Sequence, residues 1–198
     1  MAIRKFSIAE PGVKSNKFWD QEVAQGAMEP IATSIITGNA VTGFDFQNIP
    51  QTYQDLRLVL FARNTSTSVT ISNCIPQFNA DGGTNYSYTV MRGNGTAASS
   101  FRSSNQNFTY GGSFGSGNAT FGIFGCAVID ILDYKNTSRF KTLLCKSGVD
   151  LIGSGDTDIS VSTWRSTAAI NRIVIGQSYG TAYVSGSTAT LYGIKAGA

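Results

Sequence analysis

Apolar and polar side chains alternate along most of this chain from Thr33 onward, in short runs separated by turn-forming residues. The run DLRLVLFAR, residues 55–63, is the clearest: Leu56, Leu58 and Leu60 share one face, and the residues between them share the other. Alternation with a period of two is typical of a strand that is buried mainly on one side. No segment shows a convincing helical period, so we expect an all-β protein.

The strand-like runs recur at short intervals through the rest of the chain. They are residues 33–38, 42–48, 55–63, 68–73, 74–78, 85–92, 121–132, 139–147, 157–165, 170–177 and 187–195. About ten strands in one domain predict an antiparallel β-sandwich of jelly-roll type. Residues 92–120, rich in Gly, Ser and Asn, interrupt the spacing, and we expect a long loop there that is either mobile or engaged with a partner.

Residues 1–32 differ from the rest of the chain, because they show no alternation and are interrupted by prolines. They are expected to form an extended N-terminal attachment arm, and residues 33–198 the β-sandwich domain. Phe18 and Trp19 are bulky aromatic residues clustered outside any strand pattern. Exposed apolar rings need a surface that buries them, either their own domain or a neighbouring protein, so these two are the predicted arm anchors.

The composition narrows the range of partners. Only 14% of the 198 residues are charged and the formal net charge is +3, without the blocks of lysine or arginine that neutralise phosphates, so nucleic acid is not an expected partner. No window approaches the roughly 18 apolar residues of a membrane span, and no apolar signal-peptide segment follows the basic start. We expect a soluble, unprocessed chain with no membrane insertion.

Three cysteines, Cys74, Cys126 and Cys145, are widely separated and lack CxxC spacing. Their odd number argues against a disulfide framework, and their spacing argues against a zinc site. They are predicted to be small buried hydrophobic residues of a protein made in a reducing compartment.

The sequence contains no histidine, which excludes a Ser/His/Asp triad, a Cys/His pair and ordinary catalytic zinc sites. Asp130 and Asp133 are separated by an odd number of positions, so a strand sends them to opposite faces and they make a poor acid/base pair. Asp156 and Asp158 would share a face, and we expect them at a solvated strand end. Ser113 lies in GGSFG without a recognisable base. We therefore expect no enzyme, no catalytic residues, no metal and no cofactor.

The stretch FNADGGTNYSY, residues 78–88, partly resembles the start of a calcium loop, because oxygen-bearing side chains surround a glycine pair. The closing carboxylate of such a loop is missing, and Asp81 is the one acid in the stretch. A hairpin turn needs no metal, since glycines supply positive φ and Asn and Asp side chains bond the local backbone. We favour the hairpin, between the runs ending at Phe78 and beginning at Asn85.

Aromatic residues near this turn are the candidates for ligand contact. Tyr86 and Tyr88 share one strand face, and Trp164 lies in a later run. Rings beside amide side chains stack on sugars, which makes these three residues possible glycan or interface aromatics. The simpler interpretation, an aromatic pair in the core or at a subunit interface, is the better one.

Four phrases in a fixed order carry a resemblance to known proteins: IPQTYQDLRLVLFARN, QFNADGGTNYSYTVMRGNGTAASS, WRSTAAINRIVI and STATLYGIK. From about Ile49 to Lys195 the chain resembles a β-rich domain of structural proteins of tailed bacteriophages, especially cyanophages and marine phages. The resemblance implies a virion component of a tail fibre, baseplate or capsid appendage, assembled in the host bacterial cytoplasm. It implies a homo-oligomer, for which we favour a trimer, and it implies no catalytic residues.

Three functions follow as expectations. The first is a displayed appendage subunit, fastened to other virion proteins through the N-terminal arm and contacting the host surface, including its glycans. The second is a capsid decoration or cement protein that stabilises the head. The third is a free carbohydrate-binding module, which requires that Tyr86, Tyr88 or Trp164 line an exposed groove.

Overall fold

The computed structural model describes residues 27–38, 41–179 and 182–195, and every regular element in them is a β-strand. Phe18, Trp19 and most of the expected arm lie outside the described residues. The strands are β1 (Met28–Ile35), β2 (Phe44–Phe46), β3 (Asp55–Ala62), β4 (Ile71–Phe78), β5 (Tyr86–Gly93), β6 (Ala98–Gln106), β7 (Ser113–Gly115), β8 (Gly125–Leu132), β9 (Lys141–Asp150), β10 (Gly155–Trp164), β11 (Ile173–Gln177) and β12 (Thr188–Ile194).

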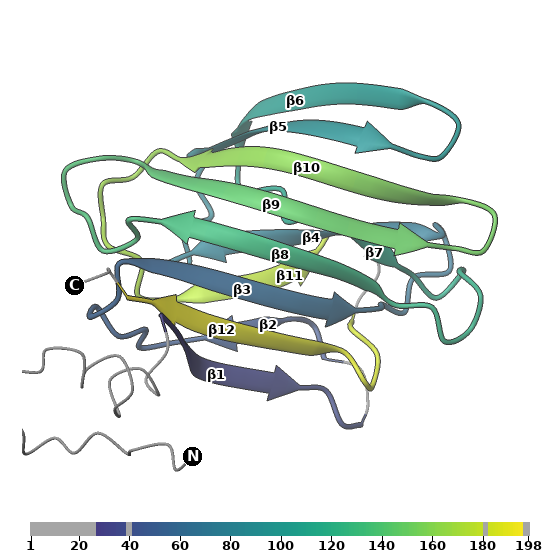
Figure 1. The fold of residues 1–198 in the computed structure, drawn as a ribbon, viewed down its shortest axis with the longest axis horizontal. Helices are drawn as coiled ribbons and strands as arrows, with labels where there is room; N and C mark the ends of the chain where they lie inside the picture. The colour runs from purple at the N-terminus through teal and green to yellow at the C-terminus, as the bar shows by residue number, and fades with distance from the viewer. Residues whose placement is uncertain (1–26, 39–40, 180–181, 196–198) are drawn as a thin grey trace, which may run out of the picture.

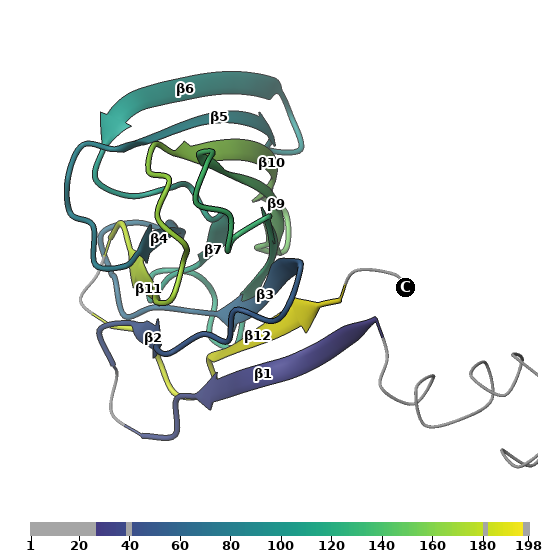
Figure 2. The same ribbon diagram turned by 90° about the vertical axis from the view of Figure 1, so that its left-hand side faces the viewer.

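Two antiparallel sheets face each other, as Figures 1 and 2 show. The large sheet has eight strands in the order β1-β12-β3-β8-β9-β10-β5-β6, and the small sheet has four in the order β2-β11-β4-β7. The prediction of an all-β antiparallel sandwich is therefore confirmed.

The strand order is that of a jelly roll with two insertions. In a jelly roll, eight strands form two Greek keys. Here β1-β12-β3-β8 and β2-β11-β4-β7 give the two four-stranded sheets of such a fold, and successive core strands change sheet except from β4 to β7. The pairs β5–β6 and β9–β10 are inserted after β4 and after β8, and both extend the large sheet at its β8 edge. In Figure 2, β5 and β6 consequently lie beyond the small sheet.

Alternation along the central strands produces the core. Leu56, Leu58 and Leu60 on β3 are fully buried, as the sequence predicts. They pack in one cluster with residues of both sheets, including Ile129, Leu191, Phe44, Phe78 and Ile173. Full burial of a side chain of this size contributes about 1.5–3 kcal/mol, so these positions fix which face of each strand points inward.

The turn in FNADGGTNYSY is not a hairpin, because β4 belongs to the small sheet and β5 to the large one. The segment crosses from one sheet to the other. Positive φ occurs at Asn79 and Ala80, at 51° and 56°, rather than at the glycines. The Asn79 side chain stabilises the crossing, since its Oδ1 accepts from the backbone N–H of Asn171 and its Nδ2 donates to the carbonyl of Ala169.

Residues 92–120 are not one long loop. They contain β6, which pairs with β5, and β7, which pairs with β4. The sequence of β6, ASSFRSSNQ, is polar and mostly exposed, so no hydrophobic alternation reveals it. Backbone hydrogen bonds to β5 define this strand instead.

Smaller differences concern boundaries and cysteines. The two runs expected at 68–73 and 74–78 merge into the single strand β4, and β1 begins at Met28, inside the segment expected to be arm. Cys74 and Cys145 are buried, as predicted, whereas Cys126 is exposed on β8, so the prediction was wrong for that residue.

Candidate functional site

Two of the three candidate aromatic residues lie in the core. Tyr86 and Trp164 are buried and their rings stack with centroids 6.2 Å apart. The Tyr86 hydroxyl accepts from the backbone N–H of Phe78 at 3.0 Å, and burial raises the pKa of Tyr86 to about 12. Neither ring can stack on a sugar, so the prediction of a glycan platform is wrong for them, and the alternative of an aromatic core pair holds.

Asp81 holds this corner of the sandwich together. Its Oδ2 accepts from the indole Nε1 of Trp164 at 2.7 Å and from Asn85, and its Oδ1 accepts from the backbone of Gly83 at 2.9 Å. Burial acts to raise the pKa of Asp81, but the hydrogen bonds from Trp164, Asn85 and Gly83 outweigh it and lower the pKa below its ordinary value. Both carboxylate oxygens of Asp81 thus accept hydrogen bonds from the protein.

No group of three or more His, Cys, Asp or Glu side chains that could hold a metal ion occurs in the described part of the chain. Asp130 forms an ion pair with Arg57 at 2.6 Å, and Asp133 lies in the turn that follows β8. These two carboxylates face different partners, which agrees with the sequence argument against an acid/base pair.

Asp158 was expected at a solvated strand end, and that expectation was wrong. It is 1% exposed and lies in a polar network between β10, β5 and the segment before β7. Its carboxylate accepts from Arg92 Nε at 2.7 Å, from the Tyr110 hydroxyl at 2.6 Å and from the Ser113 hydroxyl at 2.6 Å. Asp156 lies on the same face, 3.3 Å from Arg92, as the strand period requires.

The network connects the inserted strands to the core fold. Burial acts to raise the pKa of Asp158, but the donors Arg92, Ser113 and Tyr110 reverse this and lower it, so the carboxylate is a weak base for the Ser113 hydroxyl. Ser113 and Asp158 are both buried, which leaves a substrate no access to them.

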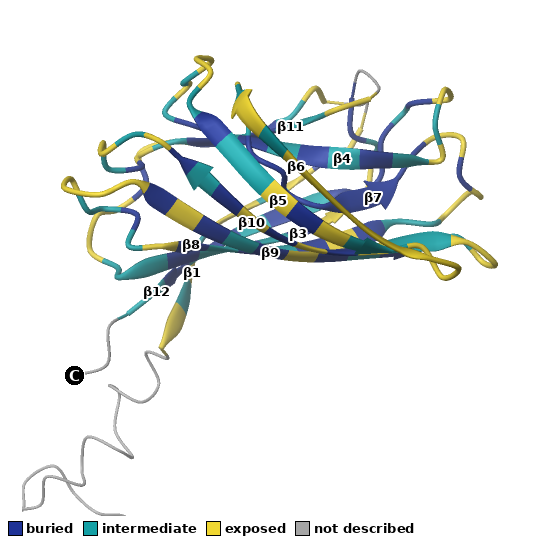
Figure 3. Cartoon of the chain, turned by 90° about the horizontal axis from the view of Figure 1, so that it is seen from above, coloured by how far each residue is buried: buried dark blue, intermediate teal, exposed yellow. Residues whose placement is uncertain are grey.

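β10 has an inverted burial pattern. Asp158, Ser160 and Ser162 point inward and are buried, whereas Ile159 and Val161 point outward and are about half exposed, at 51% and 48%. Figure 3 shows this alternation of buried and exposed positions along the strands. Polar side chains can fill the interior here because the small sheet does not extend beneath β5 and β6 (Figure 2).

Apolar side chains gather on the outer face of the large sheet, the face turned toward the viewer in Figure 1. The strand register aligns Val59 with Val128, and Ile159 with Met91, in one row across the sheet that also contains Lys146. Phe61 lies in the adjacent row and stacks on Phe124 with centroids 4.9 Å apart. Met91 is 68% exposed and Phe61 47%. We call Val59, Phe61, Met91, Val128 and Ile159 the apolar face.

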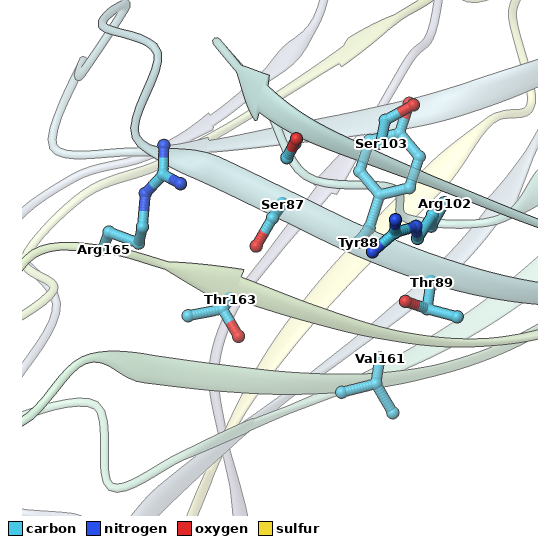
Figure 4. A pocket seen from close by; sticks show the side chains of 9 residues that line it. Ser87, Tyr88, Thr89, Arg102, Ser103, Val161, Thr163 and Arg165 are labelled. Atoms are coloured by element: carbon cyan, nitrogen blue, oxygen red, sulfur yellow. The ribbon is translucent and has the colours of Figure 1, made fainter.

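A polar groove adjoins the apolar face at the other end of β10 and β5. Its volume is about 460 Å³. The side chains that line it on the outer face include Ser87, Thr89, Arg102, Val161, Thr163 and Arg165. In Figure 4, Ser87 lies between the two arginines, and Thr163 and Val161 lie on the neighbouring strand. The groove is thus composed of hydroxyls and guanidinium groups, with one aliphatic side chain.

A β-bulge in β6 shapes this groove. Tyr86 pairs with Gln106 but Tyr88 pairs with Ser103, so β6 has one extra residue at this point. Asn105, within the bulge, has a φ of 56°. Bulges twist a strand and redirect side chains, and here the Asn105 side chain accepts a hydrogen bond from Arg165 at 2.8 Å.

Tyr88, the third candidate aromatic residue, is among the residues that line this groove, but its ring packs near Tyr110 with centroids 5.7 Å apart. Figure 4 shows the ring on the opposite side of β5 from Ser87 and Thr89. The sequence argument thus found the right strand, but the outward residues of β5 are the polar ones. Arg102 was missed because β6 was not recognised as a strand, and Arg165 was missed because its position beside β6 depends on the same pairing.

No protein-family model, curated protein or solved structure matches this chain. No helix among the described residues is long and apolar enough to cross a membrane. The fold and these surfaces are therefore the observations on which a function can rest.

Proposed function

We propose that this protein is a structural subunit of a bacteriophage virion, displayed in an appendage such as a tail fibre, baseplate or neck fibre. Two kinds of observation support the proposal. The order of motifs between Ile49 and Lys195 resembles that of tailed-phage structural proteins. The jelly roll is also an arrangement that recurs in viral capsid proteins, although a fold alone does not define a function.

The apolar face is the observation that carries the proposal. A strand in a monomer ordinarily buries its apolar side chains, but β10 exposes Ile159 and Val161 and buries Asp158, Ser160 and Ser162. The register partners of Ile159 are Met91 on β5, which is 68% exposed, and Lys146 on β9. Exposed apolar side chains gathered on one face of a sheet are typical of contacts between proteins. Self-association through it would bury these side chains in a closed oligomer, for which a trimer is the form we favour.

The free carbohydrate-binding module that depends on aromatic rings is less well supported, because Tyr86 and Trp164 are buried. Among the described residues, Ser113 and Asp158 are the most suggestive pair for catalysis, and they form a closed internal network. A role in assembly requires neither aromatic platform nor catalytic centre.

The solution mass of the recombinant protein, measured by light scattering, tests the proposal. We expect an oligomer in the full chain, and also after removal of residues 1–26, a truncation that leaves β1 intact. Ile159→Lys places a charge on the apolar face and should yield a monomer. Ile152→Lys is the matched control, since Ile152 is an exposed isoleucine in the β9–β10 turn, outside that face.

Two results would count against assembly through this face. One is a full chain that stays monomeric at every concentration up to the millimolar range. A dissociation constant in that range corresponds to a binding free energy on the order of 4 kcal/mol, which is weak self-association. The other is an oligomer that Ile159→Lys and Ile152→Lys leave equally intact, in which case another surface forms the contact.

A further inference from the structure

The groove beside the bulge of β6 is positively charged without a compensating acid. Its lining contains Arg102 and Arg165 and no aspartate or glutamate. Most other arginines of the described chain have carboxylate partners, such as Arg57 with Asp130 and Arg172 with Asp45. Two guanidinium groups that share one hollow, with no acid in its lining, favour an anionic ligand.

The two arginines are held differently. Arg165 Nη2 donates to the carbonyl of Thr84 and to Asn105 Oδ1, which fixes the plane of the guanidinium. Its Nε and Nη1 make no hydrogen bond within the described part of the chain and remain available as donors. Arg102 makes neither a hydrogen bond nor an ion pair with any described residue. The groove therefore has one fixed and one free guanidinium, placed on either side of Ser87 (Figure 4).

The rest of the lining is suited to a hydroxylated ligand. Ser87, Thr89 and Thr163 offer hydroxyl groups that both donate and accept, which matches the hydroxyls of a sugar ring. Val161, about half exposed, offers a small apolar surface to the C–H face of such a ring. The volume of about 460 Å³ lies within the range of small-ligand sites.

We propose that this groove binds an acidic saccharide, a sugar unit that carries a carboxylate or sulfate group. Arg102 and Arg165 bind anionic groups of the saccharide from the two sides of the groove, and Ser87, Thr89 and Thr163 bond the ring hydroxyls. The site is formed by β5, β6 and β10 of one chain, so it goes beyond the assembly role and does not depend on it.

Titration calorimetry and NMR with three galactose-based tetrasaccharides test this proposal. Tetragalacturonate supplies carboxylates, a carrageenan tetrasaccharide supplies sulfates, and galactotetraose supplies neither. We expect at least one of the two acidic sugars to bind, and to shift the backbone resonances of Ser87, Thr89 and Thr163. Which of them binds distinguishes a carboxylate from a sulfate ligand. Binding of galactotetraose should be undetectable or at least about tenfold weaker, since it has no anionic group to pair with the guanidinium groups.

The primary variant is Arg102→Gln, because Arg102 has no structural partner to lose. It should weaken binding of the acidic sugar by about tenfold or more, the effect of removing a charge-assisted hydrogen bond. Arg139→Gln is the matched control, since it removes the same charge from a side chain that is 71% exposed in another turn. Thr163→Val tests the hydroxyl contribution without changing the charge. Thermal unfolding of each variant establishes that the fold is retained.

Several outcomes would overturn the proposal. They are the absence of binding by both acidic sugars, equal binding of galactotetraose, and equal losses in Arg102→Gln and Arg139→Gln, which would indicate non-specific attraction between opposite charges. The outcome is separable from that of the assembly proposal. A monomer that binds an acidic sugar would support the groove proposal and argue against the displayed oligomer. An oligomer that binds no acidic sugar would support assembly and argue against the groove proposal.

Discussion

Asp158→Asn should destabilise the protein far more than the equivalent change on the surface. The substitution keeps the shape of the side chain but removes the charge that Arg92, Tyr110 and Ser113 face. Asp158 is almost completely buried, so water cannot replace the lost interaction. In the variant, the positive charge of Arg92 therefore loses its main carboxylate partner in a site that is largely shielded from water.

The magnitude follows from the contacts that remain. Breaking a buried ion pair by removing one partner costs about 3–5 kcal/mol. Arg92 would keep Asp156 at 3.3 Å, which places the expected loss near the lower limit, at about 3 kcal/mol. For a domain of this size, a loss of that order lowers the melting temperature by roughly 6–12 °C.

Asp156→Asn is a matched comparison on the same strand, with an opposite expectation. Burial raises the pKa of Asp156, more than the attraction of Arg92 lowers it, so its charge is a cost to the folded state at neutral pH. A raised carboxyl pKa contributes stability below about 3.9, the unfolded value, and loses that contribution as the pH rises through the folded-state pKa. Asp156→Asn should therefore leave stability at pH 7 unchanged or raise it slightly.

The pH dependence of the Asp158 effect has the other sign. Its folded-state pKa is lowered, so its contribution is present above about 3.9 and is lost as the pH falls through the lower folded-state value. Urea unfolding at pH 7 and near pH 3 should show a large difference between wild type and Asp158→Asn that shrinks in acid. Asp130→Asn, on the partly exposed pair with Arg57, should cost less than about 1 kcal/mol. Equal losses for Asp158→Asn and Asp130→Asn would refute this account of the network.

Three further predictions concern single sites. Trp164→Phe should lower the free energy of unfolding in urea by about 1–3 kcal/mol, because it removes the indole N–H that donates to Oδ2 of Asp81. An unchanged unfolding midpoint would show that this hydrogen bond contributes nothing to stability. Ile152 has a φ of 59° and is 79% exposed, so Ile152→Gly should stabilise the β9–β10 turn by about 1 kcal/mol, and a lower melting temperature would contradict that reasoning. In the native protein a thiol reagent should modify Cys126, while the two buried thiols react only after unfolding.

The fold could be predicted where one face of a strand is buried against the other sheet. The alternation of β3 places Leu56, Leu58 and Leu60 inward, and the core follows from it. Three of the four strands of the inserted hairpins were also predicted, at 85–92, 139–147 and 157–165, but β6 was not. β6 has no apolar face, and its only sequence signal is the absence of proline from a polar run that could pair with β5.

The candidate site escaped prediction for a related reason. The sequence pointed to aromatic residues, but Tyr86 and Trp164 are buried in the core because their rings have a large apolar surface. The groove is made from outward serine, threonine and arginine residues that are unremarkable along the chain and meet only through the pairing of β10, β5 and β6. Once β5 is assigned, the alternation of its side chains predicts that Ser87 and Thr89 point outward. The position of Arg102 can be predicted only if β6 is recognised as the partner strand.

The inverted strand β10 connects these surfaces. β10 can bury Asp158 only because a network satisfies the carboxylate, with hydrogen bonds from Arg92, Tyr110 and Ser113. Its outward residues then provide Ile159 to the apolar face and Thr163 to the groove. Loss of the network should therefore disturb both outer surfaces, which neither Ile159→Lys nor Thr163→Val would do alone. If Asp158→Asn remained folded but lost both self-association and acidic-sugar binding, the inserted hairpins would be established as one cooperative unit added to the jelly roll.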